Sequence, residues 1–122
     1  HPNCLEGLAC GPAIEERWGG NAAALTKNSA VWELEAYYLA QALADYILIL
    51  APEKIILGGG VMKQRQLFPL VRAEVARRIN GYLAAAELEH LETYIVPESL
   101  KGEQGILGCL RLGAMELKGQ QA

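Results

Sequence analysis

The chain opens on two side chains that could bind a metal ion. His1 and Cys4 are separated by two residues, a spacing that lets an imidazole and a thiolate reach one ion from a short loop. A structural zinc site needs four ligands, however, and the other candidates, Cys10, His90 and Cys109, do not stand at convincing spacing. A terminal histidine and a free cysteine without a metal therefore remain the alternative.

Glu6 follows Cys4 by two residues and is the first carboxylate of the chain. Held beside a metal-tied loop, it could accept hydrogen bonds from sugar hydroxyls. A solvated surface glutamate is the simpler interpretation, and both stay open on the spacing alone.

Three consecutive glycines, Gly58, Gly59 and Gly60, are the next candidate site. They end an apolar stretch and allow a ligand to approach the bare backbone, because no side chain intervenes and a positive φ angle costs little. In open α/β sheets, ligands bind at the carboxyl ends of strands. The pattern is neither GxGxxG nor a P-loop, and no lysine is placed to reach a phosphate. A tight structural turn and a nucleotide contact therefore both remain open.

Several other residues of reactive types are predicted to be structural. His90 lies in a charged stretch and is expected to be exposed, and Arg77 and Arg78 are expected on a solvated helix face. Trp18 and Trp32 are expected in the core or an interface. The sequence shows no Ser-His-Asp set, no paired acids and no Asp in a polar loop, so no catalytic residue is assigned.

Composition narrows the class of protein. The 122 residues fit one domain, 52% are hydrophobic and 20% are charged, and alanine and leucine carry most of the apolar content, which favours helices. A net charge of −3 without a basic stripe argues against nucleic-acid binding. Charged residues interrupt the most apolar region, so no membrane span is expected. Three scattered cysteines and the lack of a signal-peptide pattern favour the cytoplasm.

The elements that must position these residues alternate between helix and strand. Helices are predicted at 11–18, 29–51, 68–83 and 105–119, and strands at 54–57 and 93–97. The first strand has the continuous apolar character of a strand covered on both faces, and the last helix carries small residues for close packing. The order predicts a layered, helix-rich α/β fold with parallel strands and right-handed crossovers.

Two strands are too few for a stable parallel sheet, because their outer edges leave backbone groups without partners. The rest of a longer chain, a second copy or an unusual packing of helices could fill the gap. Together with a start in the middle of a motif, this predicts a fragment.

Three stretches of the chain resemble the C-terminal half of a bacterial fructokinase of the ROK family (repressors, open reading frames and sugar kinases). They are HPNCLEGLACGPAIEERWG, VWELEAYYLAQAL and ILILAPEKIILGGGVM. The resemblance covers nearly all of residues 1–122, and the last helix is its loosest part. It implies a C-terminal portion of an actin-like (ribonuclease H-like) ATPase fold, with the N-terminal domain and the phosphate-binding strands absent.

The resemblance also implies roles for the candidate residues. His1 and Cys4 would be the last two of four ligands to a structural Zn²⁺, and Glu6 would bind the sugar. Gly58, Gly59 and Gly60 would bind the adenosine of ATP. The intact enzyme would use ATP and Mg²⁺ to phosphorylate fructose, or a related hexose, at the 6-hydroxyl. It is expected to be a homodimer, and the fragment alone is expected to be inactive because the general-base Asp lies upstream.

The sequence differs from the family pattern at two places, and two other functions remain open. Cys10 stands where the family pattern has Ser, and the stretch KGEQGILGC lacks an Ala that usually precedes its Gly. A sugar-sensing ROK repressor and a non-catalytic self-association module are the alternative functions. An upstream helix-turn-helix would distinguish the repressor from the kinase, and light scattering would test the module.

Overall fold

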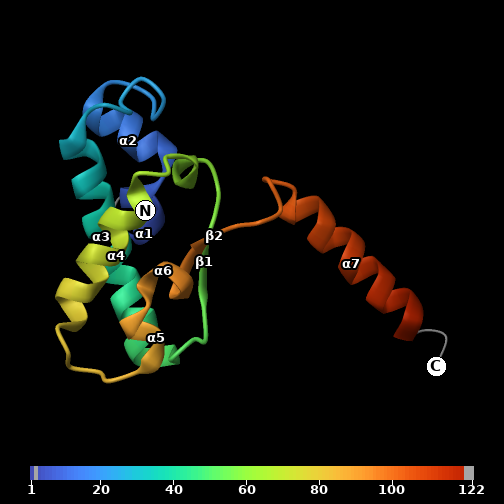
Figure 1. Ribbon diagram of the computed structural model, residues 1–122. Helices are drawn as coiled ribbons and strands as arrows, with labels where there is room; N and C mark the ends of the chain where they lie inside the picture. Colours follow the sequence, from blue (N-terminus) through green and yellow to red (C-terminus); the bar gives the residue numbers. More distant parts are fainter. Residues whose placement is uncertain (2, 120–122) are drawn as a thin grey trace.

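Helices dominate the structure, as the composition predicts (Figure 1). The computed structural model describes residues 1 and 3–119. Its elements are α1 (Leu5–Ala9), α2 (Gly11–Trp18), α3 (Ser29–Leu50), β1 (Ile55–Leu57), the 3₁₀ helix η1 (Val61–Lys63), α4 (Leu67–Ile79), α5 (Ala86–Glu89), α6 (Leu91–Tyr94), β2 (Ile95–Pro97) and α7 (Gln104–Gly119). This order confirms a helix-rich α/β arrangement with two strands.

The core lies mainly between α3 and α4, which run side by side (Figure 1). From α3 it takes side chains such as Trp32 and Ile47, and from α4 it takes Leu67, Val71 and Val75. Trp32 is 1% exposed, and its Nε1 donates hydrogen bonds to the carbonyl oxygens at 25 and 26. The structural role predicted for this tryptophan is confirmed.

The two strands form a parallel pair with Ile55 opposite Ile95. Between them the chain passes through α4, so the predicted strand–helix–strand crossover is present. In the part of the chain that the structure describes, each strand has one strand neighbour. The prediction that the first strand is covered on both faces is wrong here, because Ile56 is 65% exposed.

Arg72 of α4 anchors the second strand. Its Nε and Nη2 donate hydrogen bonds of 3.0 and 2.7 Å to the carbonyl oxygen of Ile95. A second strand element was predicted at 93–97, but Tyr94 ends α6 instead and its hydroxyl donates to the carbonyl oxygen of Pro52 at 2.9 Å. The strand is therefore shorter than its sequence pattern predicts, because Tyr94 belongs to α6 and its hydroxyl contacts the segment that follows α3.

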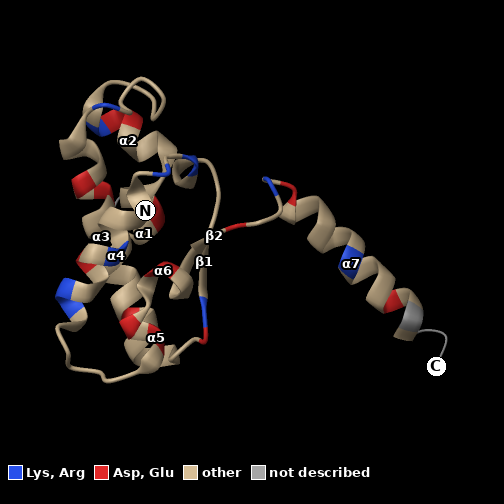
Figure 2. Ribbon diagram, viewed as in Figure 1, with Lys and Arg blue, Asp and Glu red and all other residues tan. Residues whose placement is uncertain are grey.

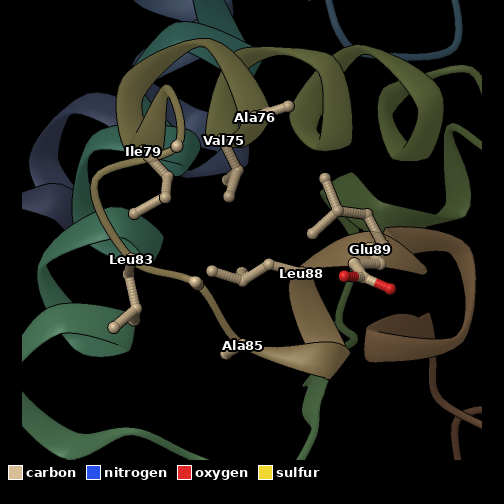
Figure 3. Close-up of a pocket in the computed structure, with 10 residues that line it drawn as sticks. Val75, Ala76, Ile79, Leu83, Ala85, Leu88 and Glu89 are labelled. Atoms are coloured by element: carbon tan, nitrogen blue, oxygen red, sulfur yellow. The ribbon is translucent and has the colours of Figure 1, made fainter.

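The helix predicted at 68–83 is also shorter than expected. It ends at Ile79 because Asn80 and Gly81 both take positive φ angles, 43° and 73°, which stop an α-helix. Leu83 therefore lies in a loop rather than on the helical stripe. This loop, together with α5, faces α4 across an apolar pocket of about 290 Å³, into which Val75, Ile79 and Leu88 project (Figure 3).

The two arginines predicted to solvate a helix face differ. Arg77 is exposed and pairs with Glu74. Arg78 corrects the prediction, because its side chain is 14% exposed, stacks on the ring of Tyr37 and donates to the Tyr37 carbonyl oxygen at 3.2 Å. It is a link between α3 and α4. His90 is exposed, as predicted.

The last helix, α7, stands away from the other elements (Figure 1). Its large apolar side chains are exposed, among them Ile106 (71%) and Leu110 (65%). A Cβ added at Gly105, Gly108 or Gly113 would meet nothing within 4 Å. The prediction that these small residues serve close packing is therefore not met among residues 1 and 3–119.

Charged residues are distributed over all parts of the molecule, with Lys and Arg interspersed among Asp and Glu (Figure 2). Among the described helices, none is long and apolar enough to cross a membrane.

Candidate functional site

The triple-glycine turn follows β1 directly and leads into η1. Two of its three glycines have a local structural reason. A Cβ on Gly58 would lie 3.1 Å from Cγ of Glu98, which follows β2, so this position needs a small residue for close approach of the two strand ends. Gly59 has φ +93°, which disfavours any other residue, whereas Gly60 has φ −61° and open space around its Cα. Only the third glycine lacks a local structural reason.

A hollow of about 670 Å³ lies beside this turn. Gly58 and Gly60 form part of its wall, and Ala9 and Cys10, at the junction of α1 and α2, form another. Most of the remaining wall is apolar, and Glu15 and Asn21 bring polar atoms to it. A largely apolar cavity with few polar groups is typical of a site for a flat organic ligand. The glycine turn therefore borders a hollow, which leaves its backbone accessible to a ligand.

A second hollow, of about 450 Å³, also borders this turn and is lined by Gly59 and Gly60. Gly60 contributes to both hollows, and the second one adds the cations Lys63, Arg65 and Lys101 together with one carboxylate, Glu98. The sequence has no lysine at a P-loop position, but the structure brings these cations to the wall of the hollow beside the glycines. Lys63 and Arg65 come shortly after the turn, and Lys101 follows the second strand. The parallel order of the strands brings both segments to one sheet edge.

His1, Cys4 and Glu6 lie within one short segment. The Sγ atom of Cys4 donates to the carbonyl oxygen of His1 at 3.2 Å and accepts a hydrogen bond from Gly7 N at 3.4 Å, so it caps α1. The amide of Asn3 donates to Nδ1 of His1 at 3.3 Å. Glu6 is exposed in the first turn of α1.

These residues do not complete a metal site by themselves. Within residues 1 and 3–119, no group of three or more His, Cys, Asp or Glu side chains is placed to hold a metal ion. A thiol and an imidazole in one loop have the chemistry of zinc ligands, but they supply two of the four that a structural site uses. Cys10 and Cys109 are free thiols and add nothing to the pair.

Helix α1 connects the Glu6 segment with the glycine hollow. Its first turn carries Glu6, and its last residue, Ala9, lines the hollow. Because an α-helix rises about 1.5 Å per residue, these two positions are about 5 Å apart along the helix axis. The candidate sugar ligand and the candidate nucleotide hollow are therefore neighbours.

Arg17 of α2 links α1 to α3. Its Nη2 donates a hydrogen bond of 3.0 Å to the carbonyl oxygen of Leu8, and its guanidinium lies 5.3 Å from the centre of the Tyr38 ring. Its Nη1 lies 4.0 Å from Oε2 of Glu35, which is fully buried in α3. Burial raises the pKa of Glu35 to about 7, and the positive charge of Arg17 opposes this rise. Neither residue stands out in the sequence, because a buried charge cannot be recognised from an amphipathic pattern.

Comparison with known proteins places these features in one family. The ROK family model matches residues 1–115. The chain is 54% identical over 123 residues to a Bacillus subtilis (strain 168) protein that is provisionally named a fructokinase, in a match that covers 100% of this chain and 41% of the relative. It is 45% identical over 118 residues to a fructokinase of Pediococcus pentosaceus, covering 97% of this chain and 40% of the relative.

A fructokinase of Streptococcus mutans serotype c (strain ATCC 700610 / UA159) is 36% identical over 112 residues, which are 92% of this chain and 38% of the relative. The chain thus spans well under half the length of the curated relatives it matches. The family match itself covers nearly the whole chain, and the chain therefore belongs to the ROK family.

Proposed function

We propose that residues 1–122 are the C-terminal portion of an ATP-dependent fructokinase. The observation that carries this proposal is the arrangement around α1, where an exposed carboxylate, Glu6, lies about one helical turn from a hollow edged by bare glycines. A kinase needs its sugar and its nucleotide side by side, and three relatives with the same segment bear the name fructokinase.

The nucleotide would lie along the glycine turn. The apolar hollow suits the adenine ring, and the backbone of Gly58–Gly60 would lie against the adenosine. The cationic hollow that shares Gly60 suits the phosphates, because Lys63, Arg65 and Lys101 would attract their negative charge. In this proposal the base and the phosphates would occupy two hollows that share Gly60.

The sugar would be bound through Glu6. A carboxylate accepts hydrogen bonds from hydroxyl groups, and the exposed position on α1 leaves both oxygens accessible. His1 and Cys4 would hold a structural Zn²⁺ together with two ligands from outside this chain, which would fix the start of α1. Mg²⁺ would accompany ATP and neutralise charge on its phosphates, and no residue of this chain is assigned to it.

Transfer of the γ-phosphoryl group to the 6-hydroxyl of fructose needs a base to accept the hydroxyl proton. The resemblance to ROK fructokinases implies an upstream Asp as this base, so the proposal assigns the proton transfer to a part of the enzyme outside this chain. The reaction thus depends on positioning by two halves of one cleft. The isolated chain is expected to be inactive.

The same proposal includes the fold, the oligomeric state and the compartment of the whole enzyme. Two parallel strands with one covered face, one largely uncovered face and unpaired outer edges suit one end of a larger sheet, as in the actin-like ATPase fold. A homodimer stays a prediction for the whole enzyme. The cytoplasm stays the proposed compartment, supported by three cysteines that are free thiols.

A sugar-sensing repressor remains the alternative function, and the names of the relatives favour the kinase. The direct test is an assay of ATP-dependent fructose phosphorylation with the full-length protein and with residues 1–122 alone. Activity of the full-length protein and none of the chain alone would support the proposal. Fructose phosphorylation by residues 1–122 alone would contradict it, because the base would then lie within them.

A further inference from the structure

A buried carboxylate without hydrogen bonds lies in the middle of α3. Glu35 is 0% exposed, and neither Oε1 nor Oε2 has a hydrogen-bond partner among the described residues. The closest cationic atom is Nη1 of Arg17, at 4.0 Å, which also lacks a hydrogen bond. Its neighbours in the helix, Trp32 and Ala36, are ordinary core residues.

Such an arrangement is poor for stability. A buried charge loses its hydration, and attraction to one partner at 4 Å offsets only part of this cost. An apolar side chain of similar size at position 35 would fit the surrounding core at lower cost. The pair therefore needs an explanation other than stability.

The contacts of Arg17 supply one. Arg17 lies in α2, and its guanidinium contacts two other helices. It faces Glu35 and Tyr38 of α3, and it donates a hydrogen bond to the Leu8 carbonyl oxygen of α1. The two amino groups of the guanidinium contact different partners: Nη1 faces the carboxylate of Glu35, and Nη2 donates to α1. With Glu35 beneath it, the guanidinium is turned so that Nη2 points at α1.

Helix α1 needs an external support of this kind. It has five residues, none of them fully buried, and only Gly7, Leu8 and Ala9 are half-buried where α1 packs against α3. Intrinsic helix stability and core packing therefore fix its orientation only in part. The capping contact of Cys4 holds its first turn, and the Arg17 hydrogen bond holds its last. Glu6 lies between these two supports.

We propose that Arg17 and Glu35 are positioning residues for the sugar site: the carboxylate of Glu35 orients Arg17, and Arg17 fixes α1 so that Glu6 faces the sugar. The inference rests on the proposed function of Glu6. It assigns to a core residue of α3 an effect on sugar affinity, without any contact between that residue and the sugar.

The test uses the full-length protein with Glu35→Gln, Arg17→Met and the double variant. Each is expected to raise the KM for fructose about tenfold, because a small misplacement of a binding group is costly, while the KM for ATP changes by less than about twofold. The double variant is expected to match the single ones, since the two residues act as a unit. Glu74→Gln, which removes a carboxylate paired with Arg77 and Arg78 on α4, is the matched control and is expected to leave both KM values unchanged.

Hydrogen exchange provides a measurement that does not depend on activity. The amide of Leu8, which donates to the Cys4 carbonyl oxygen at 3.0 Å, is expected to exchange faster in Glu35→Gln and Arg17→Met but not in Glu74→Gln. Unchanged exchange at α1 would overturn the positioning role, whatever the substrate proves to be. Faster exchange with an unchanged KM for fructose would overturn the link to Glu6. A full-length protein that does not phosphorylate fructose would contradict the proposed function, while the exchange data would still test the support of α1.

Discussion

Gly58 and Glu98 meet where the two strands end, so closely that a Cβ on the glycine would lie 3.1 Å from Cγ of the glutamate. This contact brings the glycine turn after β1 next to the segment that follows β2. Gly58 is thus tightly packed, whereas Gly60 has open space around it and is accessible to a ligand.

Alanine substitutions in the turn should therefore have different effects. Gly59→Ala is expected to lower the free energy of unfolding by about 1–2 kcal/mol, because φ +93° disfavours a side chain. Gly60→Ala is expected to change it by less than about 0.5 kcal/mol, since its φ is −61° and its surroundings are open. If the nucleotide lies against the turn, Gly60→Ala should still weaken ATP binding about tenfold. Thermal unfolding and calorimetric titration of the full-length protein with ATP would measure both, and unchanged ATP affinity in Gly60→Ala would argue against the nucleotide contact.

Replacement of Glu6 should affect the sugar and spare the nucleotide. Glu6→Gln removes a charged hydrogen-bond acceptor, so the KM for fructose is expected to rise about 10–100-fold, with the KM for ATP nearly unchanged. Glu16→Gln, an exposed glutamate of the neighbouring helix, is the control and is expected to change neither value. Steady-state kinetics of the full-length protein would decide, and an equal rise of both KM values in Glu6→Gln would contradict a sugar-specific role.

The buried Glu35 predicts a dependence of stability on pH. Its pKa is raised from 4.5 to about 7, mainly by burial, so the folded protein binds a proton more tightly than the unfolded chain does. The resulting stabilisation is present in full below pH 4.5 and is lost as the pH rises to about 7, a change of about 3 kcal/mol. Arg17 of α2 is the charged group that faces the carboxylate and opposes the shift, and Glu6 on the adjacent α1 is exposed.

Glu35→Gln should remove this part of the pH dependence, because the amide does not titrate. Glu33→Gln, an exposed neighbour on the same helix, should retain it. Melting temperatures of the full-length protein between pH 4.5 and 8 would show the difference. Parallel curves for the wild type and Glu35→Gln would contradict the raised pKa.

The exposed apolar residues of α7 predict that residues 1–122 self-associate when isolated. Ile106, Leu110 and Leu117 are each more than half exposed, and water-exposed apolar surface of this extent favours association. The double variant Leu110→Gln and Leu117→Gln is expected to reduce the association. Light scattering of the isolated chain would test this, with Arg111→Gln on the same helix as the control. A monomeric wild-type chain would contradict the prediction.

Local chemistry along the chain is enough to predict the main helices and strands, although tertiary packing shifts some of their ends. Pro52 fixes the end of α3, where Ala51 takes a left-handed conformation, and the glycines end β1. The motif around Glu6 and the triple glycine also identified the family, since short functional segments keep their residue types and spacing. These features are readable without knowing what packs against them.

Only the tertiary structure showed which residues share a site. The cations Lys63 and Lys101 are distant in sequence and meet because two parallel strands end at one edge. Arg17 and Glu35 meet because α2 folds against α3, and the carboxylate becomes unusual through the loss of water around it rather than through its sequence context. Pair contacts and desolvation depend on chain segments that pack from far away, which is why no local pattern could predict them.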